Sequence, residues 1–426
     1  AVYKSRRAWP LKEENPLRDR PGLWDNFESL FNLNKQHIPG AVPEKQRIQL
    51  EDNDKKELLR KVVQKTKFIH ALENRAKALK KAPADLKILL KPNFMFTYNK
   101  RDHTTYTDPV LVKELIDIMY YEGFTNISVV ESQSTYGQYF ENRNVKYVAN
   151  YIGLDGGGGK YRIVDLTEDE QIEPEIEFAG RLKGQKVPET WAHGDFRISF
   201  AKNKTHSYAY YTLAIKCIYG ALPLADKFKE YHCKMGIYGS TIEYLLHYPV
   251  DFGFIDAYVS ADGPFGIFAD KSPNYTRTII GGENIIAVSW VGASKMGYDP
   301  MVSQFMKNSV TQFGKPRIDL AGDLKDEVYS PWANVPIVME IGLNDVLDRH
   351  YRFGNLMYSA LSNMDEKAFP RKPESIWMKA VRFMDKPIRD MVFVQKTSPE
   401  LAKLMYHKGS FQEPDKNAFN DVIFDK

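Results

Sequence analysis

Lysines follow two apolar runs of this 426-residue chain. Lys91 comes directly after the run 86–90, and Lys204 comes shortly after the run 196–201. Lys216 lies a little further on, within a mostly apolar stretch. A lysine in apolar surroundings is costly unless it reaches water or an anion. Because lysine binds anions as a point charge, this pattern predicts a site for a small carboxylate or phosphate.

Carboxylates and a histidine occur at comparable positions. Glu131, Asp256 and Asp262 each end or follow an apolar run, and His206 lies two residues after Lys204. Carboxylates could bind a divalent cation or transfer protons, and a histidine could act as a general base or a metal ligand. Divalent-metal chemistry and acid–base chemistry both stay open. The candidate catalytic residues are Lys204, His206, Lys216, Glu131 and Asp256, and the candidate metal ligands are Glu131, Asp256 and Asp262.

The stretch 86–132 is predicted to position several of these groups. Apolar runs at 86–90 and 126–130 are short enough to be buried strands. Between them, Asp108 directly before Pro109 is typical of a helix start. Two strands joined by a helix are expected to be parallel, with their carboxyl ends at the edge where open α/β sheets bind ligands. Candidate ligand-binding residues at that edge are Lys91, Asn93, Thr104, Thr105, Ser132, Thr205, Asp262 and Gly263.

A second unit repeats this design. The run 196–201 predicts a strand, a polar segment follows it, and 211–222 is expected to form a helix that carries Lys216. Downstream, 252–259 and 277–280 predict strands, and Asn284 is expected to cap a helix over 285–296. Upstream, the apolar stripe over 51–81 predicts one long helix. The fold class is therefore α/β, with two Rossmann-like parallel-sheet lobes and helical N- and C-terminal extensions.

The domain organisation follows from these elements. Residues 1–82 are expected to form an N-terminal arm and helix, and residues 83–323 an α/β core with a central cleft. Residues 324–426 are predicted to be a helical C-terminal extension, a candidate lid or oligomerisation region. Homo-oligomerisation is accordingly one of the partner interactions that the sequence suggests.

Composition limits the function classes. A net charge of +4 is small for this length and argues against dedicated nucleic-acid binding. No continuous apolar run is long enough to span a bilayer. Cys217 and Cys233 cannot form a four-cysteine iron–sulfur or zinc site within one chain, and whether they are free or disulfide-bonded stays open. Cytoplasmic localisation is the default expectation, but a start at Ala1 also fits a processed exported protein.

Several motifs resemble one family. KPNF at 91–94, TTYTDP at 104–109 and VVES at 129–132 are similar to the bacterial and archaeal family called domain of unknown function 362. Later stretches agree with it, and the resemblance covers about 86–323. It implies a fold and a site, but the family carries no general assigned activity. Some members bear ferredoxin-like iron–sulfur motifs, which this chain lacks, so no iron–sulfur cluster is expected.

Two functions fit these observations. The first is an enzyme acting on a small anionic metabolite, in which lysines hold the anion and a carboxylate or His206 does acid–base or metal chemistry. The reaction class stays open among lyase, isomerase and oxidoreductase. The alternative is a non-catalytic binding or assembly protein that uses its terminal extensions as docking segments.

Overall fold

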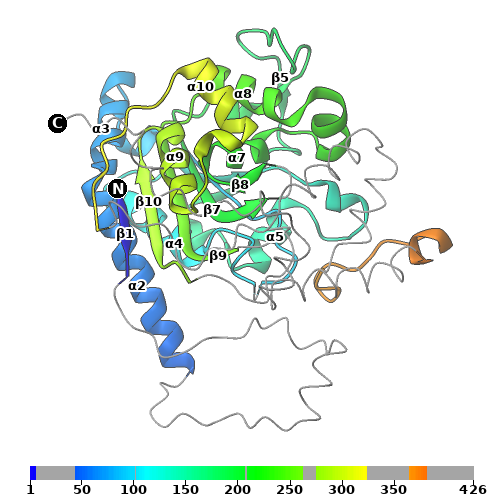
Figure 1. The fold of residues 1–426 in the computed structure, drawn as a ribbon, viewed down its shortest axis with the longest axis horizontal. Coiled ribbons are helices and arrows are strands. Elements are labelled where there is room, and N and C mark those ends of the chain that lie inside the picture. Colours follow the sequence, from blue (N-terminus) through cyan, green and yellow to red (C-terminus); the bar gives the residue numbers. More distant parts are fainter. Residues whose placement is uncertain (6–43, 101, 207–208, 262–274, 324–363, 381–426) are drawn as a thin grey trace.

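The computed structural model describes residues 1–5, 44–100, 102–206, 209–261, 275–323 and 364–380 (Figure 1). The predictions for Asp262 and Gly263 lie outside these residues. So do most of the N-terminal arm and most of the C-terminal extension. Within the described ranges, no helix has the length and apolar character needed to cross a membrane.

One eight-stranded sheet forms the centre of the structure, in the order β1-β10-β9-β7-β2-β3-β4, with β8 paired to β7. The five strands from β9 to β4 in this order are parallel, whereas β1, β10 and β8 pair antiparallel. A separate pair of short strands consists of β5 (Gln171–Ile172) and β6 (Val187–Pro188). The strands of the main sheet are β1 (Val2–Lys4), β2 (Ile88–Pro92), β3 (Ile127–Glu131), β4 (Arg162–Asp165), β7 (Phe196–His206), β8 (Tyr210–Thr212), β9 (Phe252–Ala261) and β10 (Thr278–Gly282).

The predicted α/β class with a mostly parallel sheet is confirmed. The strands of the two predicted units lie side by side in this one sheet, because β2 of the first unit pairs directly with β7 of the second. The first residues of the predicted N-terminal arm also belong to the sheet, since β1 pairs with β10 at its edge.

Helices cover both faces of the sheet, so the central strands are buried on two sides. Side chains alternate between the faces: Ile88 and Leu90 of β2 join one apolar core, and Leu89 joins the other. The first core packs under α2 (Glu44–Lys65), α3 (Phe68–Leu79), α4 (Pro109–Tyr121) and α5 (Val145–Tyr151). The second packs under α6 (Glu189–Ala192), α7 (Ala214–Cys217), α8 (Ile237–His247), α9 (Ile285–Lys295) and α10 (Gln304–Phe313).

Short helical turns connect these elements. They are η2 (Pro83–Asp85), η3 (Thr135–Gln138), η4 (Gly157–Gly159), η5 (Ile218–Ala221) and η7 (Pro300–Val302). A π-helix, η6 (Phe228–Met235), lies between η5 and α8. π-helical turns are rare and occur frequently at functional sites.

Both predicted helix caps are confirmed. The Asp108 side chain accepts a hydrogen bond from the Val110 backbone nitrogen at 2.9 Å, and Pro109 occupies the first position of α4. The Asn284 side chain accepts hydrogen bonds from the backbone nitrogens of Ile286 and Ala287 at the start of α9. Because α4 joins the parallel strands β2 and β3, its cap helps to position the carboxyl end of β2.

The prediction of one helix over 51–81 is wrong. The helix α2 ends at Lys65 and α3 begins at Phe68. Lys67 between them has φ 53°, in the left-handed region that interrupts a right-handed helix. The Thr66 hydroxyl donates to the Val62 carbonyl at 2.7 Å, which holds the end of the first helix. The apolar stripe therefore continues across a bend.

The prediction of a helix over 211–222 is also wrong at its start. Tyr210–Thr212 form β8, which pairs antiparallel with the end of β7. Only then does α7 begin, and the four-residue turn η5 follows it. Pairing with a neighbouring strand outweighs the local helical pattern at these residues, so the pocket described below gains a β-hairpin as one wall.

A segment from the C-terminal extension packs on the core. We call residues 364–372 the C-terminal strap. The backbone nitrogen of Asp365 donates to the Tyr98 carbonyl at 2.7 Å, and that of Lys372 donates to the Tyr139 carbonyl at 2.9 Å. Phe369 is fully buried in the first apolar core. The strap therefore links the segments that contain Tyr98 and Tyr139 on the α4 face of the sheet.

Candidate functional site

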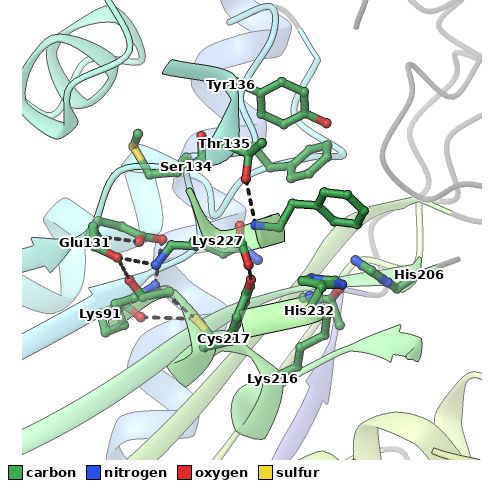
Figure 2. A pocket seen from close by; sticks show the side chains of 18 of the residues that line it. Lys91, Glu131, Ser134, Thr135, Tyr136, His206, Lys216, Cys217, Lys227 and His232 are labelled. Carbon is green, nitrogen blue, oxygen red and sulfur yellow. Dashed lines mark hydrogen bonds and ion pairs between the residues drawn. The ribbon is translucent and has the colours of Figure 1, made fainter. Parts of the chain in front are cut away.

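The strand order reverses at β2. From β2 the chain proceeds outward through β3 to β4, and then returns to β7 on the other side of β2. Such a reversal leaves a crevice at the carboxyl ends of the strands, where ligands of α/β proteins bind. A pocket of about 120 Å³ lies at this point (Figure 2). The predicted site residues that line it are Lys91, Asn93, Glu131, Ser132, Lys204, His206 and Lys216.

One end of the pocket is closed by a buried ion pair. Lys91 and Glu131 lie near or at the ends of the neighbouring strands β2 and β3, and their Nζ and Oε1 atoms are 2.6 Å apart. Their side chains are only 1% and 5% exposed. Burial raises the pKa of Glu131, although the charge of Lys91 opposes this shift. Glu131 therefore releases its proton at a higher pH than a solvent-exposed glutamate does.

A lysine that the sequence reasoning missed adjoins this pair. Lys227 donates from Nζ to the Ser132 hydroxyl at 2.7 Å and to the Leu222 carbonyl. Burial lowers the pKa of Lys227 to about 7, an effect that the negative charge of Glu131 opposes. Lys227 was overlooked because 225–234 is rich in charge, a composition that is typical of a solvent-exposed helix. We call Lys91, Glu131, Ser132 and Lys227 the closed end of the pocket.

Two further lysines line the remainder of the pocket. Lys204 extends from β7 and Lys216 from α7, and within the described residues neither has a carboxylate at ion-pair distance. Their closest aromatic contacts place Lys204 Nζ 5.2 Å from the Phe96 ring centre and Lys216 Nζ 5.8 Å from that of Tyr219. Burial lowers the pKa of Lys216 to about 8 and that of Lys204 well below its usual range. We call the region around Lys204 and Lys216 the open end.

The hairpin of β7 and β8 forms the wall beside the open end. Lys204 pairs with Thr212 across the two strands, so their side chains are neighbours. The hydroxyls of Thr212 and Ser134 line the pocket and are buried, and neither forms a hydrogen bond in the described part of the chain. Buried hydroxyls without a partner are rare and costly, so a ligand that bonds to them would relieve that cost.

His206 also lies on this hairpin, which the sequence did not predict. It lines the pocket two residues beyond Lys204. Burial, together with the positive charges of Lys216 and Lys204, lowers the pKa of His206 well below its usual value. The neutral imidazole is therefore the favoured form, which suits a proton acceptor and not a fixed positive charge.

A register shift in β7 directs the side chains of Lys202 and Lys204 to different surroundings. The pairing of β7 with β9 is regular up to Lys202 and shifts between Lys202 and Lys204. Irregularities of this kind re-aim side chains. Lys204 reaches the pocket, whereas Lys202 forms a fully buried ion pair with Asp256, with Nζ and Oδ2 2.8 Å apart.

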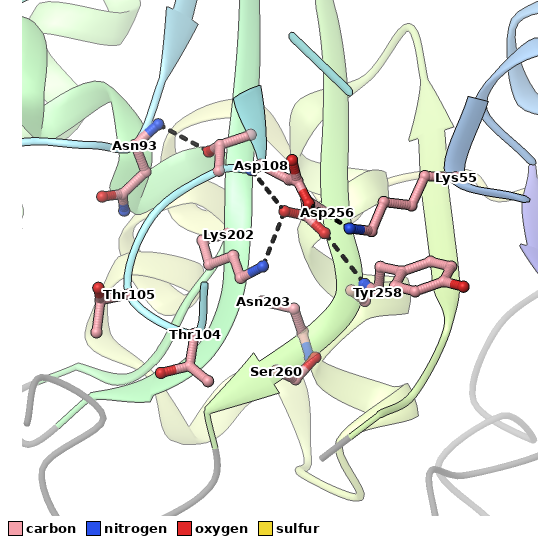
Figure 3. Close-up of polar contacts among 12 residues, drawn as sticks. Lys55, Asn93, Thr104, Thr105, Asp108, Lys202, Asn203, Asp256, Tyr258 and Ser260 are labelled. Carbon is pink, nitrogen blue, oxygen red and sulfur yellow. Dashed lines mark hydrogen bonds and ion pairs between the residues drawn. The ribbon is translucent and has the colours of Figure 1, made fainter. Parts of the chain in front are cut away.

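Asp256 does not line the pocket. It accepts a hydrogen bond from the Lys202 ammonium and two more from the backbone nitrogens of Asp108 and Tyr258, at 2.9 and 3.1 Å (Figure 3). Asp108 in turn pairs with Lys55 of α2 at 2.8 Å. A catalytic or metal role for Asp256 stays a prediction, and this geometry favours a structural role that ties α2 and α4 to the sheet.

Three predicted ligand-binding threonines also lie away from the pocket. Thr104 donates to the Asp102 carboxylate at 2.6 Å, and Thr105 donates to the Asp102 backbone carbonyl at 3.3 Å. Thr205 donates to the Ala261 carbonyl at 3.5 Å. These hydroxyls stabilise the loop before α4 and the end of the sheet, so the sequence pattern placed them at the right edge but not in the pocket.

The described residues include two cysteines but no metal-binding cluster. Among the described residues, no group of three or more histidine, cysteine or acidic side chains is arranged to hold a metal ion. Neither Cys217 nor Cys233 forms a disulfide bond. Cys217 lines the pocket and donates from Sγ to the Lys91 carbonyl at 3.5 Å, and burial raises the pKa of its thiol.

Comparison with known proteins identifies one family. The model of a family described as Domain of unknown function (DUF362) matches residues 88–294. This span contains all of the described residues that line the pocket, from Lys91 to His232. A search of curated proteins finds no match. The family resemblance expected from the sequence motifs is confirmed.

Proposed function

Residues 88–294 belong to the domain of unknown function 362 family, whose name assigns no activity, and we propose that this chain is an enzyme acting on a small anionic ligand. One observation supports this above all. Lys204 and Lys216 line the same buried pocket, and the described residues offer neither of them a carboxylate partner.

Electrostatics explains why an anion suits the open end. Loss of hydration on burial is the main cause of the lowered pKa values of both lysines, and the charge of Lys216 lowers the pKa of Lys204 further. An anion bound near both would offset the repulsion and restore their ordinary protonation. At the closed end, by contrast, Lys91 already has Glu131 as its partner. The anionic group of the ligand therefore belongs beside Lys204 and Lys216.

Proton transfer is the chemistry that the remaining groups support. Burial raises the pKa of Glu131 above its usual value and lowers that of Lys227 to about 7, so both shifts are towards neutral pH. Groups shifted in this way are frequent in active sites, because a general acid or base works best near the operating pH. We assign Glu131 and Lys227 as the proton donor and acceptor, with His206 as a further acceptor. The lyase, isomerase and oxidoreductase classes remain alternatives.

The binding or assembly alternative stays a prediction, as do homo-oligomerisation and a divalent metal. The described terminal segments pack on their own core, β1 through β10 and the C-terminal strap through Tyr98 and Tyr139. Intramolecular packing of this kind does not by itself favour a docking role.

Native mass spectrometry with elemental analysis, on protein purified from its own source, tests the proposal. We expect a bound small anion that is lost from a Lys204→Met/Lys216→Met double variant. Lys307→Met, which changes an exposed lysine of α10, serves as the control and should retain the anion. Retention of the anion by the double variant would contradict the proposal, and so would a stoichiometric metal without any anion.

A further inference from the structure

Aromatic side chains form the wall that faces the lysines of the open end. Tyr136 lies on the side of the pocket away from Lys216, above Ser134 and Thr135 (Figure 2). The ring of Phe96 meets that of Tyr136 edge to face, with centres 5.5 Å apart. Phe228, the first residue of the π-helix, adds a third ring to the lining. A ligand in this pocket therefore contacts rings as well as cations.

The size of the pocket limits the ligand. Its volume is about 120 Å³. For comparison, an engineered apolar cavity of about 150 Å³ binds benzene. One ring-sized group therefore fills most of the space, and a large polyanion would not fit within it.

The arrangement of polar groups fixes the position of the ligand's charge. The closed end is satisfied internally, because Lys91 pairs with Glu131 and Lys227 donates to Ser132. The buried Thr212 hydroxyl, which forms no hydrogen bond in the described part of the chain, lies across the hairpin from Lys204. A single carboxylate at this position could bind the two lysines through one oxygen and accept a hydrogen bond from the Thr212 hydroxyl through the other. The remaining space is bounded by the rings.

Taken together, these features define a class of ligand. We propose that the pocket binds a monocarboxylate with a flat apolar body of about the size of a benzene ring, its carboxylate between Lys204, Lys216 and Thr212, and its body against Phe96 and Tyr136. A fully hydrated phosphate dianion is disfavoured, because the aromatic wall offers it no hydrogen bonds in exchange for lost water. This inference rests on the proposed function and narrows its ligand.

Isothermal titration calorimetry with four probes tests the ligand class. The probes are benzoate, benzyl alcohol, inorganic phosphate and citrate, at constant ionic strength and pH 7. We expect benzoate to bind at least tenfold more tightly than each of the other three. Benzyl alcohol has the same body without the charge, and phosphate and citrate carry charge without the ring.

Two variants locate the carboxylate. Thr212→Val preserves the shape of the side chain and removes only the hydroxyl, and Lys204→Met removes the ammonium. Each should weaken benzoate binding about tenfold, whereas the surface control Lys307→Met should leave it unchanged. Circular dichroism checks that each variant is folded, and the comparison of the four probes on the unaltered chain does not depend on the variants.

The outcomes separate the two proposals. If phosphate or citrate binds at least as tightly as benzoate, the ligand class is wrong while the anion site stands. If benzyl alcohol binds as tightly as benzoate, or if folded variants of Thr212 and Lys204 retain full affinity, the placement of the carboxylate is wrong. If none of the three anions binds, the proposed function itself fails.

Discussion

Gly220 leaves the room in which the buried ion pair of the closed end forms. A Cβ atom built on Gly220 would lie 2.8 Å from Glu131 Oε2 and would overlap Lys91 Nζ. The Gly220 carbonyl also accepts hydrogen bonds from the backbone nitrogen and the hydroxyl of Ser132. The absence of a side chain at one residue thus permits the contact between two strand ends and a turn.

Replacement of Gly220 by alanine is expected to break or displace this pair. Gly220→Ala should lower the free energy of unfolding by about 3 kcal/mol, since loss of a buried ion-pair partner typically costs 3–5 kcal/mol. Urea unfolding measures the change. The matched control is Gly137→Ala, because a Cβ there meets only the Cβ of Arg143 at 3.8 Å, an ordinary contact. Equal stability of the two variants would show that Gly220 does not protect the pair.

The lowered pKa of Lys227 predicts a pH dependence of stability. Between pH 7 and 10.5 the unfolded chain holds a proton on Lys227 that the folded chain has largely released. In the protein without ligand, burial of Lys227 therefore does not lower the free energy of unfolding above pH 10.5. As the pH falls from 10.5 towards 7, the free energy of unfolding decreases. The expected slope from this residue is at most about 1.4 kcal/mol per pH unit. Lys216 contributes with the same sign.

Urea unfolding at pH 7, 8 and 9 measures this slope. In Lys227→Met the slope should be smaller than in the unaltered chain, because the titrating amine is gone. Lys229→Met is the control, since the side chain of Lys229 is 45% exposed on the same helix. An unchanged slope in Lys227→Met would place the proton on another group.

Sequence reasoning identified the lysines of the open end but not the whole site. Lys204 and Lys216 stood out because each lies in or beside an apolar run, where a charge requires a reason. Lys227 lies among other charged residues, and its burial at the start of the π-helix is evident only in the folded chain. Asp256 met the same criterion as Lys204, but its partner Lys202 is visible only once β7 and β9 are paired.

At the scale of elements, caps were predictable and strand pairing was not. Asp108 and Asn284 act within their own helices, so a local pattern is enough to identify them. The strand β8 forms beside β7. Its tyrosines and threonine favour strands, but three residues are too short a pattern to outweigh the helical pattern that follows. The break between α2 and α3 likewise depends on backbone geometry at Lys67, a residue with no special turn preference.

The cap of α4 has a second function that a mutation can reveal. Asp108 also pairs with the buried Lys55, so Asp108→Asn keeps an oxygen for the cap but removes the charge. We expect a loss of about 3 kcal/mol, the lower end of the usual cost, because Glu51 and Asp52 stay within 3.5 Å of Lys55. Thermal and urea unfolding measure it.

The comparison is Asn284→Ala, which removes a cap alone and should cost about 1 kcal/mol. If Asp108→Asn is no more destabilising than Asn284→Ala, the Lys55 pair contributes little and Asp108 serves mainly as a cap. A larger loss for Asp108→Asn would show that charge links α2 to α4.

At the scale of the molecule, one sheet joins the described segments as far as residue 323, whereas residues 364–380 add no strand to it. The family match ends at residue 294, within α9, yet the first apolar core continues into the C-terminal strap. Phe369 stacks edge to face on Tyr151 at 4.8 Å and lies 4.6 Å from the Arg143 guanidinium. The motifs predicted the family-like core, but they carried no information about which later residues return to it.

Removal of the Phe369 ring tests the contribution of the strap. Phe369→Ala should lower the free energy of unfolding by about 3 kcal/mol, because truncation of a buried phenylalanine typically costs 3–5 kcal/mol. Trp377→Ala, whose side chain is 79% exposed, should leave stability unchanged. Equal values for the two would mean that the strap adds no stability to the core.

The strap also sets the order in which the pocket is completed during synthesis. Lys372 donates from Nζ to the Gly137 carbonyl at 2.6 Å, within the η3 turn whose Thr135 and Tyr136 line the pocket. Among the described residues, the last one that lines the pocket is His232, so a ribosome must add 140 more residues before Lys372 exists. At about 5–20 residues per second this takes roughly 7–28 s. A nascent chain therefore holds all of the described lining residues well before Lys372 can bind the turn that carries Tyr136.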